Sequence, residues 1–453
     1  MSPAQSQVLA PSPSTTADVR AKPCTVDVLV DALIVGRKLR HPVYDQNGIL
    51  LLAAGTEITT ELKSRLKDRG VVEIAVRRED AGTVTLLTSE EDGADPLSFR
   101  SELTSRLDGM IGSDSFFVKN SGAAVRDKVV LHGCKAYDPD KREYIIQQHE
   151  ETAQTLDNMI REAMAGRRLS GNEITTVTAT YLTELTADSD NVLTAASEAA
   201  RDQELTNHCL QMSILSMAIG VEMGLDEVNV RTLGLCGLVH DWGMIRVPEE
   251  LRKPRRFPDP GDYLPVQKHP IYALELLEQI EGVPSVVPLV AYQVHERPNG
   301  TGYPRRRCAQ AIHLFAKILL VADTYIHLTH QQSYRLPVMP YAAMECLLKL
   351  AARKALDPKV VRALLNMVGL FPIGSCVVLT DGSVGRVYRR TADYTRPVVQ
   401  RLQDSNGRVI PSSSPDSLVD LTESDLEVRQ ALPNLARKET ALTDDELRIQ
   451  ARR

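Results

Sequence analysis

Aromatic residues are scarce in this chain of 453 residues, where they make up 4% of the sequence and include a single Trp. A protein that binds nucleic-acid strands by stacking needs many aromatic faces, so this composition does not favour that class. The chain is also mildly acidic, with a formal net charge of −6. A general nucleic-acid binder carries a basic field instead, and we therefore expect no DNA partner.

Paired cysteines and long apolar runs are lacking as well. The seven cysteines are scattered and form no C-x-x-C pair, which favours reduced thiols over a disulfide framework or a structural zinc site. No run approaches the roughly 18 apolar residues of a membrane-spanning helix. Residues 1–23 lack the apolar segment of a secretory signal. We therefore expect a cytoplasmic protein with no membrane partner and a disordered tail over residues 1–24.

The length suggests two or three domains, at about 150 residues each. Residues 25–87 predict a small α+β accessory unit, with a hairpin turn at Asn47-Gly48 and a helix from Thr59 to Arg69. This unit shows no catalytic constellation, so we expect a regulatory role or a protein signalling partner for it. Residues 88–141, which include an acidic stretch, are interpreted as a linker.

The rest of the chain is expected to be mostly α, followed by a short β unit. Apolar spacing and glycine punctuation predict helices over residues 144–165, 173–186, 203–223, 228–240, 265–281, 284–295, 312–328 and 340–355. We interpret 142–370 as a helical bundle domain. Turns at Asp381-Gly382 and Asn406-Gly407 predict a small antiparallel β unit over 371–422, and 423–453 is interpreted as a charged tail.

Metal-ligating residue types recur through the predicted bundle at intervals of 26 to 32 residues, about one helix and a turn apart. They are His208, His240, Asp241, His269, His295 and Asp323. An antiparallel bundle can deliver one such side chain per helix to a common level of its core. A carboxylate and an imidazole that end an apolar run, as His240-Asp241 do, are costly to bury unless they are paired or coordinated.

Each of these residues alone has an ordinary structural explanation, because a single His on an apolar helix is usually hydrogen-bonded in the core. Their joint order is what favours a metal site. Imidazole nitrogens combined with carboxylate oxygens suit Fe, Mn, Co or Zn better than an all-oxygen Ca or Mg site. We expect a divalent transition metal, Fe or Mn, as one or two ions.

The ordered motif resembles that of the HD superfamily of metal-dependent phosphohydrolases. The stretch from His295 to Pro304 (HERPNGTGYP) is similar to the signature of the HD-GYP branch, usually HHE-x-x-DG-x-GYP. Residues 312–323 and 356–361 are also similar to that branch. The resemblance covers about residues 195–370 and implies an HD-type helical bundle that hydrolyses a cyclic dinucleotide, cyclic di-GMP, to pGpG and GMP.

The resemblance also implies roles for individual residues. A first metal would be held by His208, His240, Asp241 and Asp323, with His240 and Asp241 as the catalytic pair. Asp241 would bridge to a second metal held by His269 and His295, and Glu204 matches a carboxylate that serves a third ion. Gly302 and Tyr303 would line the substrate pocket, where Arg335 would supply a basic group.

The sequence departs from the branch at several positions. Val294 replaces the first His of HHE, Met244 replaces the Lys of HD-x-GK, Asn299 replaces the Asp of DG, and Gln332 replaces the first Arg of R-P-Y-R. An arginine run at 305–307 could replace missing phosphate-binding cations, although such runs usually face solvent. Two hypotheses follow: a phosphodiesterase, or a catalytically inactive nucleotide receptor or signalling scaffold. A purely structural helical protein would require the motif to be a coincidence.

Overall fold

A computed structural model describes residues 25–30, 33–45, 49–71, 73–77, 80, 84, 102–199, 205–254 and 263–443. Its contacts divide the chain into two units, residues 1–93 and residues 94–453. The expected tail at 1–24 lies outside the described residues. Among the described helices, none has the length and hydropathy needed to cross a membrane.

The first unit is a small α+β structure. Its elements are β1 (Thr25–Leu29), β2 (Val43–Tyr44), β3 (Leu50–Leu52), α1 (Thr60–Asp68) and β4 (Glu73–Arg77). Strand β1 pairs antiparallel with β4, and β2 pairs antiparallel with β3 as the predicted hairpin requires. Thr59 caps α1, because its hydroxyl accepts a hydrogen bond from Leu62 N at 3.0 Å.

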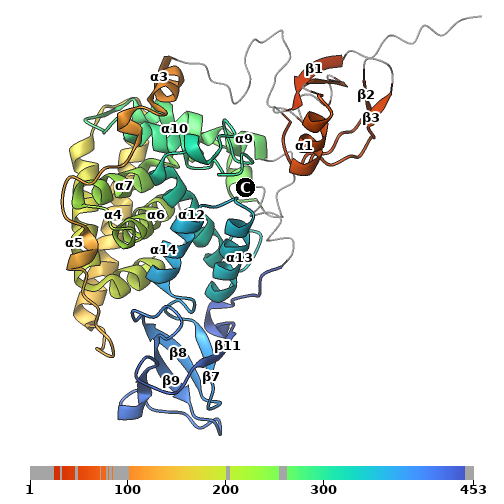
Figure 1. Cartoon of the computed structure of the whole chain (residues 1–453). Coiled ribbons are helices and arrows are strands. Elements are labelled where there is room, and N and C mark those ends of the chain that lie inside the picture. The colour runs from red at the N-terminus through yellow and green to blue at the C-terminus, as the bar shows by residue number, and fades with distance from the viewer. Residues whose placement is uncertain are drawn as a thin grey trace, which may run out of the picture. The chain divides into compact units, whose positions relative to one another are not determined.

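The second unit is mostly helical (Figure 1). Its helices are α3 (Glu102–Met110), α4 (Pro139–Met164), α5 (Gly171–Ala199), α6 (Leu205–Glu222), α7 (Glu227–Val239), α8 (Glu249–Arg252), α9 (Tyr263–Gln267), α10 (His269–Leu277), α11 (Val286–Gln293), α12 (Leu314–Thr329), α13 (Pro340–Ala352) and α14 (Pro358–Val368). The 3₁₀ turn η4 (Trp242–Arg246) follows α7, and a short parallel pair joins β5 (Leu169–Ser170) to β6 (Ile280–Glu281).

Helix α6 forms the centre of this unit, where it contacts α4, α5, α7, α12 and α14 (Figure 1). It is apolar on nearly all sides and most of its residues are buried, as expected for a helix surrounded by others. One large hydrophobic core extends from α4 to α14. The expectation of a helical bundle is confirmed.

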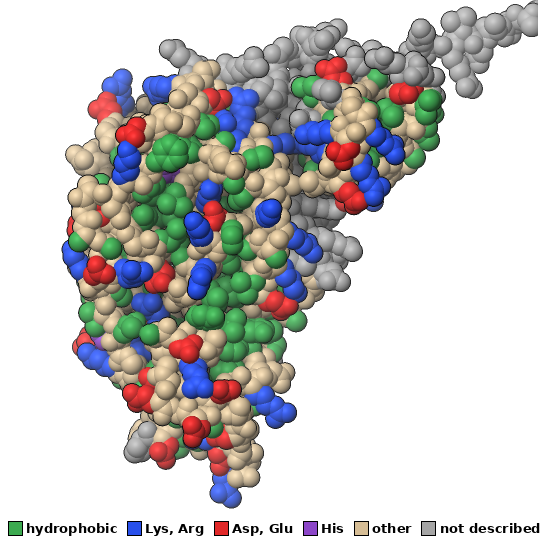
Figure 2. All heavy atoms as spheres, viewed as in Figure 1, with side chains coloured by type: hydrophobic (Ala, Val, Ile, Leu, Met, Phe, Trp, Pro, Cys, Tyr) green, Lys and Arg blue, Asp and Glu red, His purple; other side chains and the backbone are tan. Residues whose placement is uncertain are grey.

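A five-stranded antiparallel sheet follows the bundle, in the order β10-β9-β8-β7-β11. The strands are β7 (Cys376–Leu379), β8 (Val384–Arg389), β9 (Val398–Gln403), β10 (Leu418–Asp420) and β11 (Val428–Leu432). The predicted Asp381-Gly382 turn joins β7 to β8. On the face shown in Figure 2, acidic and basic side chains are interspersed with apolar areas, without a large field of one sign.

Three segments differ from the sequence-based expectation. Residues 265–281 contain two helices, α9 and α10, because Pro270 has no N–H to continue a single one. The expected linker at 88–141 contains α3, which lies beside the arginine run through Asp108 and Arg307. The expected charged tail at 423–453 contains β11, which forms an edge of the sheet by pairing with β7.

Candidate metal centre

The predicted metal-ligating residues converge in the helical unit, although they come from five different helices or helix ends. They are His208 in α6, His240 and Asp241 after α7, His269 at the start of α10, His295 after α11, and Asp323 in α12. All are at least nine-tenths buried as side chains except His208, which is 24% exposed. Glu204 lies outside the described residues.

The carboxylate of Asp241 is at the middle of this cluster. Its Oδ1 lies 3.2 Å from His240 Nε2 and 3.1 Å from His269 Nε2. The same oxygen is 3.7 Å from His295 Nε2, while Oδ2 is 3.5 Å from His208 Nε2. One carboxylate therefore faces four imidazoles.

Asp323 closes the cluster from α12. Its Oδ1 is 3.6 Å from His208 Nε2, and its Oδ2 is 4.0 Å from His295 Nδ1. Two groups of three have ligand atoms within 4.8 Å of one another: His208, His240 and Asp241, and Asp241, His269 and His295. Asp241 belongs to both groups, so the geometry suits either one ion or two ions that share its carboxylate.

Backbone carbonyls orient two of the imidazoles. His240 Nδ1 lies 2.9 Å from Gly237 O, and His269 Nδ1 lies 2.6 Å from Val266 O. Because a carbonyl only accepts hydrogen bonds, Nδ1 carries the proton in each ring and Nε2 presents a lone pair. Backbone-oriented histidines of this kind are typical of metal ligands.

Those lone pairs point at a carboxylate, which is itself an acceptor. The buried Nε2 of His240 has no hydrogen-bond partner among the described residues. Acceptors that converge in a buried site repel one another unless a cation lies between them, and unsatisfied buried polar atoms are costly. The donor set of imidazole nitrogens and carboxylate oxygens therefore fits a divalent transition metal.

The protonation states agree with metal binding. Burial lowers the pKa of His295 to about 4, so this ring is neutral at pH 7. A neutral imidazole and an ionised carboxylate are the forms that ligate metals.

Two glycines let the ligand-bearing helices approach one another. A Cβ on Gly237 would lie 2.7 Å from Ser213 N in α6, and a Cβ on Gly243 would lie 2.5 Å from Ala273 N in α10 and overlap His269 O. Such distances exclude any side chain. Glycine at these positions therefore permits the close packing that brings the ligands together.

The predicted Gly302-Tyr303 turn also packs against the cluster. The Tyr303 ring stacks on His295 with centroids 4.9 Å apart and an interplanar angle of 14°. Tyr303 N donates to His295 O at 3.1 Å. A Cβ on Gly302 would overlap this same carbonyl oxygen, so only glycine fits beneath the stacked ring.

Glu296 was not singled out by the sequence analysis, although it follows His295 in the signature. It is 1% exposed and accepts hydrogen bonds from Arg305 N at 2.6 Å and Arg307 N at 2.8 Å. Burial raises its pKa to about 7. Glu296 therefore holds the loop that follows Tyr303, and its place beside a ligand His was the signal available in the sequence.

Two side chains of the arginine run at 305–307 bond other residues of the protein. Arg305 Nε donates to Tyr292 Oη at 2.8 Å, and Arg307 pairs with Asp108 of α3. These contacts occupy both guanidinium groups with partners inside the protein. This geometry therefore does not support the hypothesis that Arg305 or Arg307 replaces the missing phosphate-binding cations.

Arg335 is engaged at the C-terminal end of α12. Its guanidinium donates to Leu328 O at 3.1 Å, to His330 O at 3.4 Å and to His327 O. Carbonyls at a helix C-terminus need such donors, because they have no partner within the helix. The structure thus gives Arg335 a contact with the end of α12, and its role toward a substrate stays a prediction.

The departures from the HD-GYP signature have local roles. Val294 is fully buried in the apolar core, and Met244 is a partly buried neutral side chain of η4. Asn299 Oδ1 accepts from Thr301 N at 3.2 Å and thereby shapes the turn before Gly302. Gln332 Nε2 donates to His327 O at 3.2 Å.

Histidines outside the cluster serve other contacts. His149 lies 3.1 Å from Tyr181 Oη, and His313 caps α12 by accepting from Phe315 N. His132 Nε2 bonds Ala187 O at 2.8 Å. The six described cysteines are free, in agreement with reduced thiols, and Cys236 is buried core rather than a member of either metal group.

Comparison with known proteins agrees with the site. Residues 184–360 match the family model described as HD domain. Over 188 residues the chain is 33% identical to a cyclic di-GMP phosphodiesterase of Pseudomonas aeruginosa, a match that covers 41% of this chain and 44% of that protein. It is 36% identical over 137 residues to 3'3'-cGAMP-specific phosphodiesterase 1 of Vibrio cholerae, covering 30% of this chain and 31% of that one.

Among solved structures, the chain matches an HDG"Y"P protein from Bdellovibrio bacteriovorus with a TM-score of 0.40 and 19% sequence identity. The match covers 75% of this chain and 98% of that chain. The matches to the two phosphodiesterases span less than half of the length of each of those proteins. The family match covers residues 184–360, which include all six described residues of the cluster, so this part of the chain is similar to HD domains.

Proposed function

We propose that this chain is a metal-dependent phosphodiesterase that hydrolyses a cyclic dinucleotide. The observation that carries the proposal is the convergence of four imidazoles on Asp241, with Asp323 closing the cluster. Two relatives that match part of this chain are named as phosphodiesterases of cyclic di-GMP and of 3'3'-cGAMP. Cyclic di-GMP is the substrate we test first.

The ligand assignment combines the two groups of three with Asp323, which lies beside His208. His208, His240, Asp241 and Asp323 would hold one ion, and Asp241, His269 and His295 would hold a second. Iron and manganese suit this mixed nitrogen and oxygen set. A bound metal supplies an activated water and neutralises charge on the phosphate.

The chain's own residues prepare the site for that chemistry. The carbonyls of Gly237 and Val266 fix the ring orientation of His240 and His269, so the ligands need no rearrangement on binding. Tyr303 covers His295 and limits the access of bulk water from that side. The neutral Met244 leaves the developing charge on the phosphate without a cation at that position, which favours a reduced rate.

Hydrolysis of cyclic di-GMP tests the proposal. We expect the full chain, loaded with Mn²⁺ or Fe²⁺, to release a linear dinucleotide that chromatography detects. Loss of an orienting outer contact already costs roughly 10–100-fold in activity, so His240→Ala should abolish turnover. The matched control His132→Ala removes an imidazole outside the cluster and should retain it. Wild-type turnover no higher than that of His240→Ala would overturn the proposal.

A second candidate is a catalytically inactive nucleotide receptor or scaffold. Val294 favours it, since an apolar side chain at 0% exposure stands where the HD-GYP signature has a ligand. Titration calorimetry with cyclic di-GMP separates the candidates. Binding without hydrolysis supports the receptor, hydrolysis supports the enzyme, and neither supports a scaffold that would signal through a protein partner of the first unit.

A further inference from the structure

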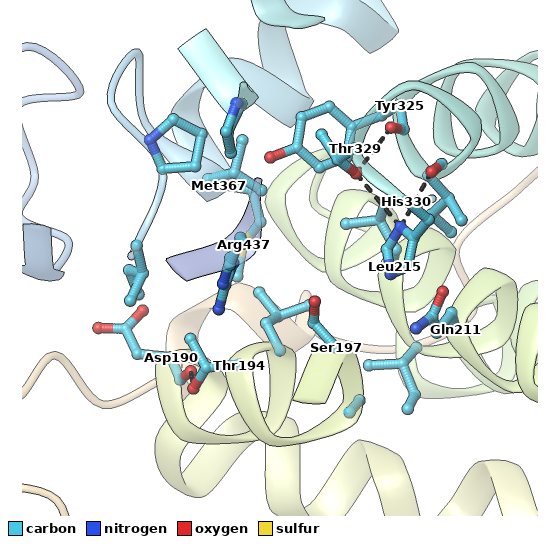
Figure 3. Close-up of a pocket in the computed structure, with 18 of the residues that line it drawn as sticks. Asp190, Thr194, Ser197, Gln211, Leu215, Tyr325, Thr329, His330, Met367 and Arg437 are labelled. Carbon is cyan, nitrogen blue, oxygen red and sulfur yellow. Dashed lines mark hydrogen bonds between the residues drawn. The ribbon is translucent and has the colours of Figure 1, made fainter. Parts of the chain in front are cut away.

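A cavity lies in the helical unit, and its lining is separate from the candidate metal centre. It is enclosed by the second half of α5, by α6, α12 and the end of α14, and by the segment around Arg437 (Figure 3). None of the six described cluster residues lines it. Its volume is about 120 Å³, close to that of an engineered apolar cavity of about 150 Å³ that holds benzene.

The cavity wall is largely apolar but has two distinct polar ends. Leu193, Ile214, Leu215 and Met367 contribute to the apolar part. Figure 3 shows Gln211 and His330 on one side, and Asp190, Thr194 and Arg437 on the other. A ligand would therefore contact apolar side chains along its body and polar atoms at its end.

At the Gln211 end, two buried nitrogen atoms are unsatisfied. Gln211 is 6% exposed, and its Nε2 has no hydrogen-bond partner among the described residues. The Nε2 of His330 also has none within that part of the chain. Native proteins rarely leave such atoms unpaired, so a group from outside the chain is expected to satisfy them.

The two atoms need complementary partners. His330 Nδ1 lies 2.9 Å from Ile326 O and must donate to it, so His330 Nε2 is an acceptor. Burial lowers the pKa of His330 to about 4, which agrees with a neutral ring. Gln211 Nε2 is a donor. The ligand must therefore accept from one atom and donate to the other.

Charge narrows the choice of ligand. The side chains of Gln211 and His330 are neutral, so neither can form an ion pair that would offset the lost hydration of a charged ligand head placed between them. At the opposite end, Asp190 is already bonded to Arg390 Nε at 3.0 Å. We propose that this cavity binds a compact, uncharged ligand whose mainly apolar body carries one hydroxyl or amide group, placed between Gln211 and His330.

The proposal does not depend on the proposed phosphodiesterase activity, because the cavity and the metal cluster have separate linings. Both nevertheless use α6, where Gln211 follows His208 by three residues. Hydrolysis of cyclic di-GMP tests the phosphodiesterase proposal, and ligand binding to the full chain tests the cavity proposal. The failure of one proposal can therefore be told apart from the failure of the other.

Phenol and toluene are suitable probes, since they have the same ring and differ in one hydroxyl group. We expect phenol to bind the full-length protein saturably in ligand-observed NMR or calorimetry, about tenfold more tightly than toluene, because one hydrogen bond is worth about that factor. Benzoate, whose head is charged, should bind more weakly than phenol. No saturable binding of phenol, or equal affinity for phenol and toluene, would overturn the proposal.

Variants locate the binding. Gln211→Leu should lower the affinity for phenol about tenfold and leave the affinity for toluene unchanged. Ser197→Leu should fill the cavity and abolish the binding of both compounds. Gln147→Leu makes the same change on the exposed face of α4 and should alter neither. Unchanged phenol affinity in Gln211→Leu would overturn the proposal, and the comparison of probes on the wild type tests it even if a variant fails to fold.

Discussion

At the residue scale, the metal centre depends on a glycine that is not itself a ligand. Gly243 lies where a Cβ would overlap His269 O and come within 2.5 Å of Ala273 N. Gly243→Ala should therefore separate η4 from α10 and move Asp241 away from His269. Overpacking of this kind costs about 1–3 kcal/mol of unfolding free energy, and the bound metal content should fall.

The control for this change is another glycine-to-alanine substitution in a helix. Gly109 in α3 has nothing within 4 Å of an added Cβ. Gly109→Ala should be neutral or stabilise by up to about 1 kcal/mol, because alanine favours helix. Metal content is measured by elemental analysis and stability by urea denaturation. Full metal content in Gly243→Ala would contradict the packing argument.

A buried histidine outside the metal centre predicts a pH dependence of stability. His149 is fully buried beside Tyr181, and burial lowers its pKa to about 4. In the unfolded chain the pKa is near 6.5. The unfolded state therefore binds more protons between these values, so this contribution to stability is complete above pH 6.5 and is lost as the pH falls toward 4.

The variant His149→Asn tests this sign, because an amide can still bond Tyr181 but does not titrate. From pH 7 to pH 4, the wild type should lose roughly 3 kcal/mol more unfolding free energy than the variant, since one pKa unit corresponds to about 1.4 kcal/mol. Urea denaturation at several pH values gives both curves. Parallel curves would show that folding does not lower the pKa of His149.

At the element scale, a buried ion-pair network joins the sheet to the helical bundle. Arg389 of β8 is 1% exposed and bonds both oxygens of Asp188, at 3.0 and 3.2 Å. Its Nε donates to Lys135 O, and its guanidinium lies 4.0 Å from the Tyr137 ring centroid. Asp188 is also the point where α5 kinks, and its carboxylate accepts from Asn191 N as a cap.

Removal of one member of this network should be far more costly than removal of a surface pair. Arg389→Ala leaves Asp188 buried without its cation, which typically costs about 3–5 kcal/mol. The matched variant Arg401→Ala, in neighbouring β9, breaks a more exposed pair with Asp381 and should cost about 0–1 kcal/mol. Equal losses of unfolding free energy in the two variants would contradict this role for Arg389.

The accuracy of the sequence-based predictions depended on how local each signal was. Helices α6, α7 and α12 were found from apolar runs, and the turn between β7 and β8 from Asp381-Gly382, because those signals lie within the elements. Strand β11 was missed because none of its residues is fully buried and its position depends on pairing with the distant β7. Asp188, where α5 kinks, bonds Arg389 about 200 residues away, and no local pattern encodes this contact.

The same distinction applies to the metal centre. The residues of the cluster could be singled out because His and Asp recur in the sequence at intervals of about one helix and a turn. The orienting carbonyls of Gly237 and Val266, and the contacts of Glu296 with the loop at 305–307, are visible only in three dimensions. The predicted substrate role of Arg335 came from resemblance alone, and its contacts with α12 could not have been read from the motif.

At the scale of the whole molecule, the two units have separate hydrophobic cores, one over residues 28–84 and one from α4 to α14. Such a chain need not unfold in one step. The single Trp reports on one unit only: Trp242 is fully buried, follows Asp241 directly and donates to Leu238 O at 2.8 Å. Its fluorescence therefore follows the helical unit, whereas far-ultraviolet circular dichroism follows both units.

Metal binding should shift only the transition that Trp242 reports. A ligand that binds the folded state alone stabilises it by about 2.7 kcal/mol at a free concentration of 100 Kd. We expect Mn²⁺ to raise the fluorescence-detected midpoint, chelator to lower it, and any transition of residues 1–93 to stay unchanged. In His240→Ala the shift should disappear, while His132→Ala should keep it. A shift that persists in His240→Ala would place the metal elsewhere, because the lone pair of His240 is directed at the cluster by Gly237.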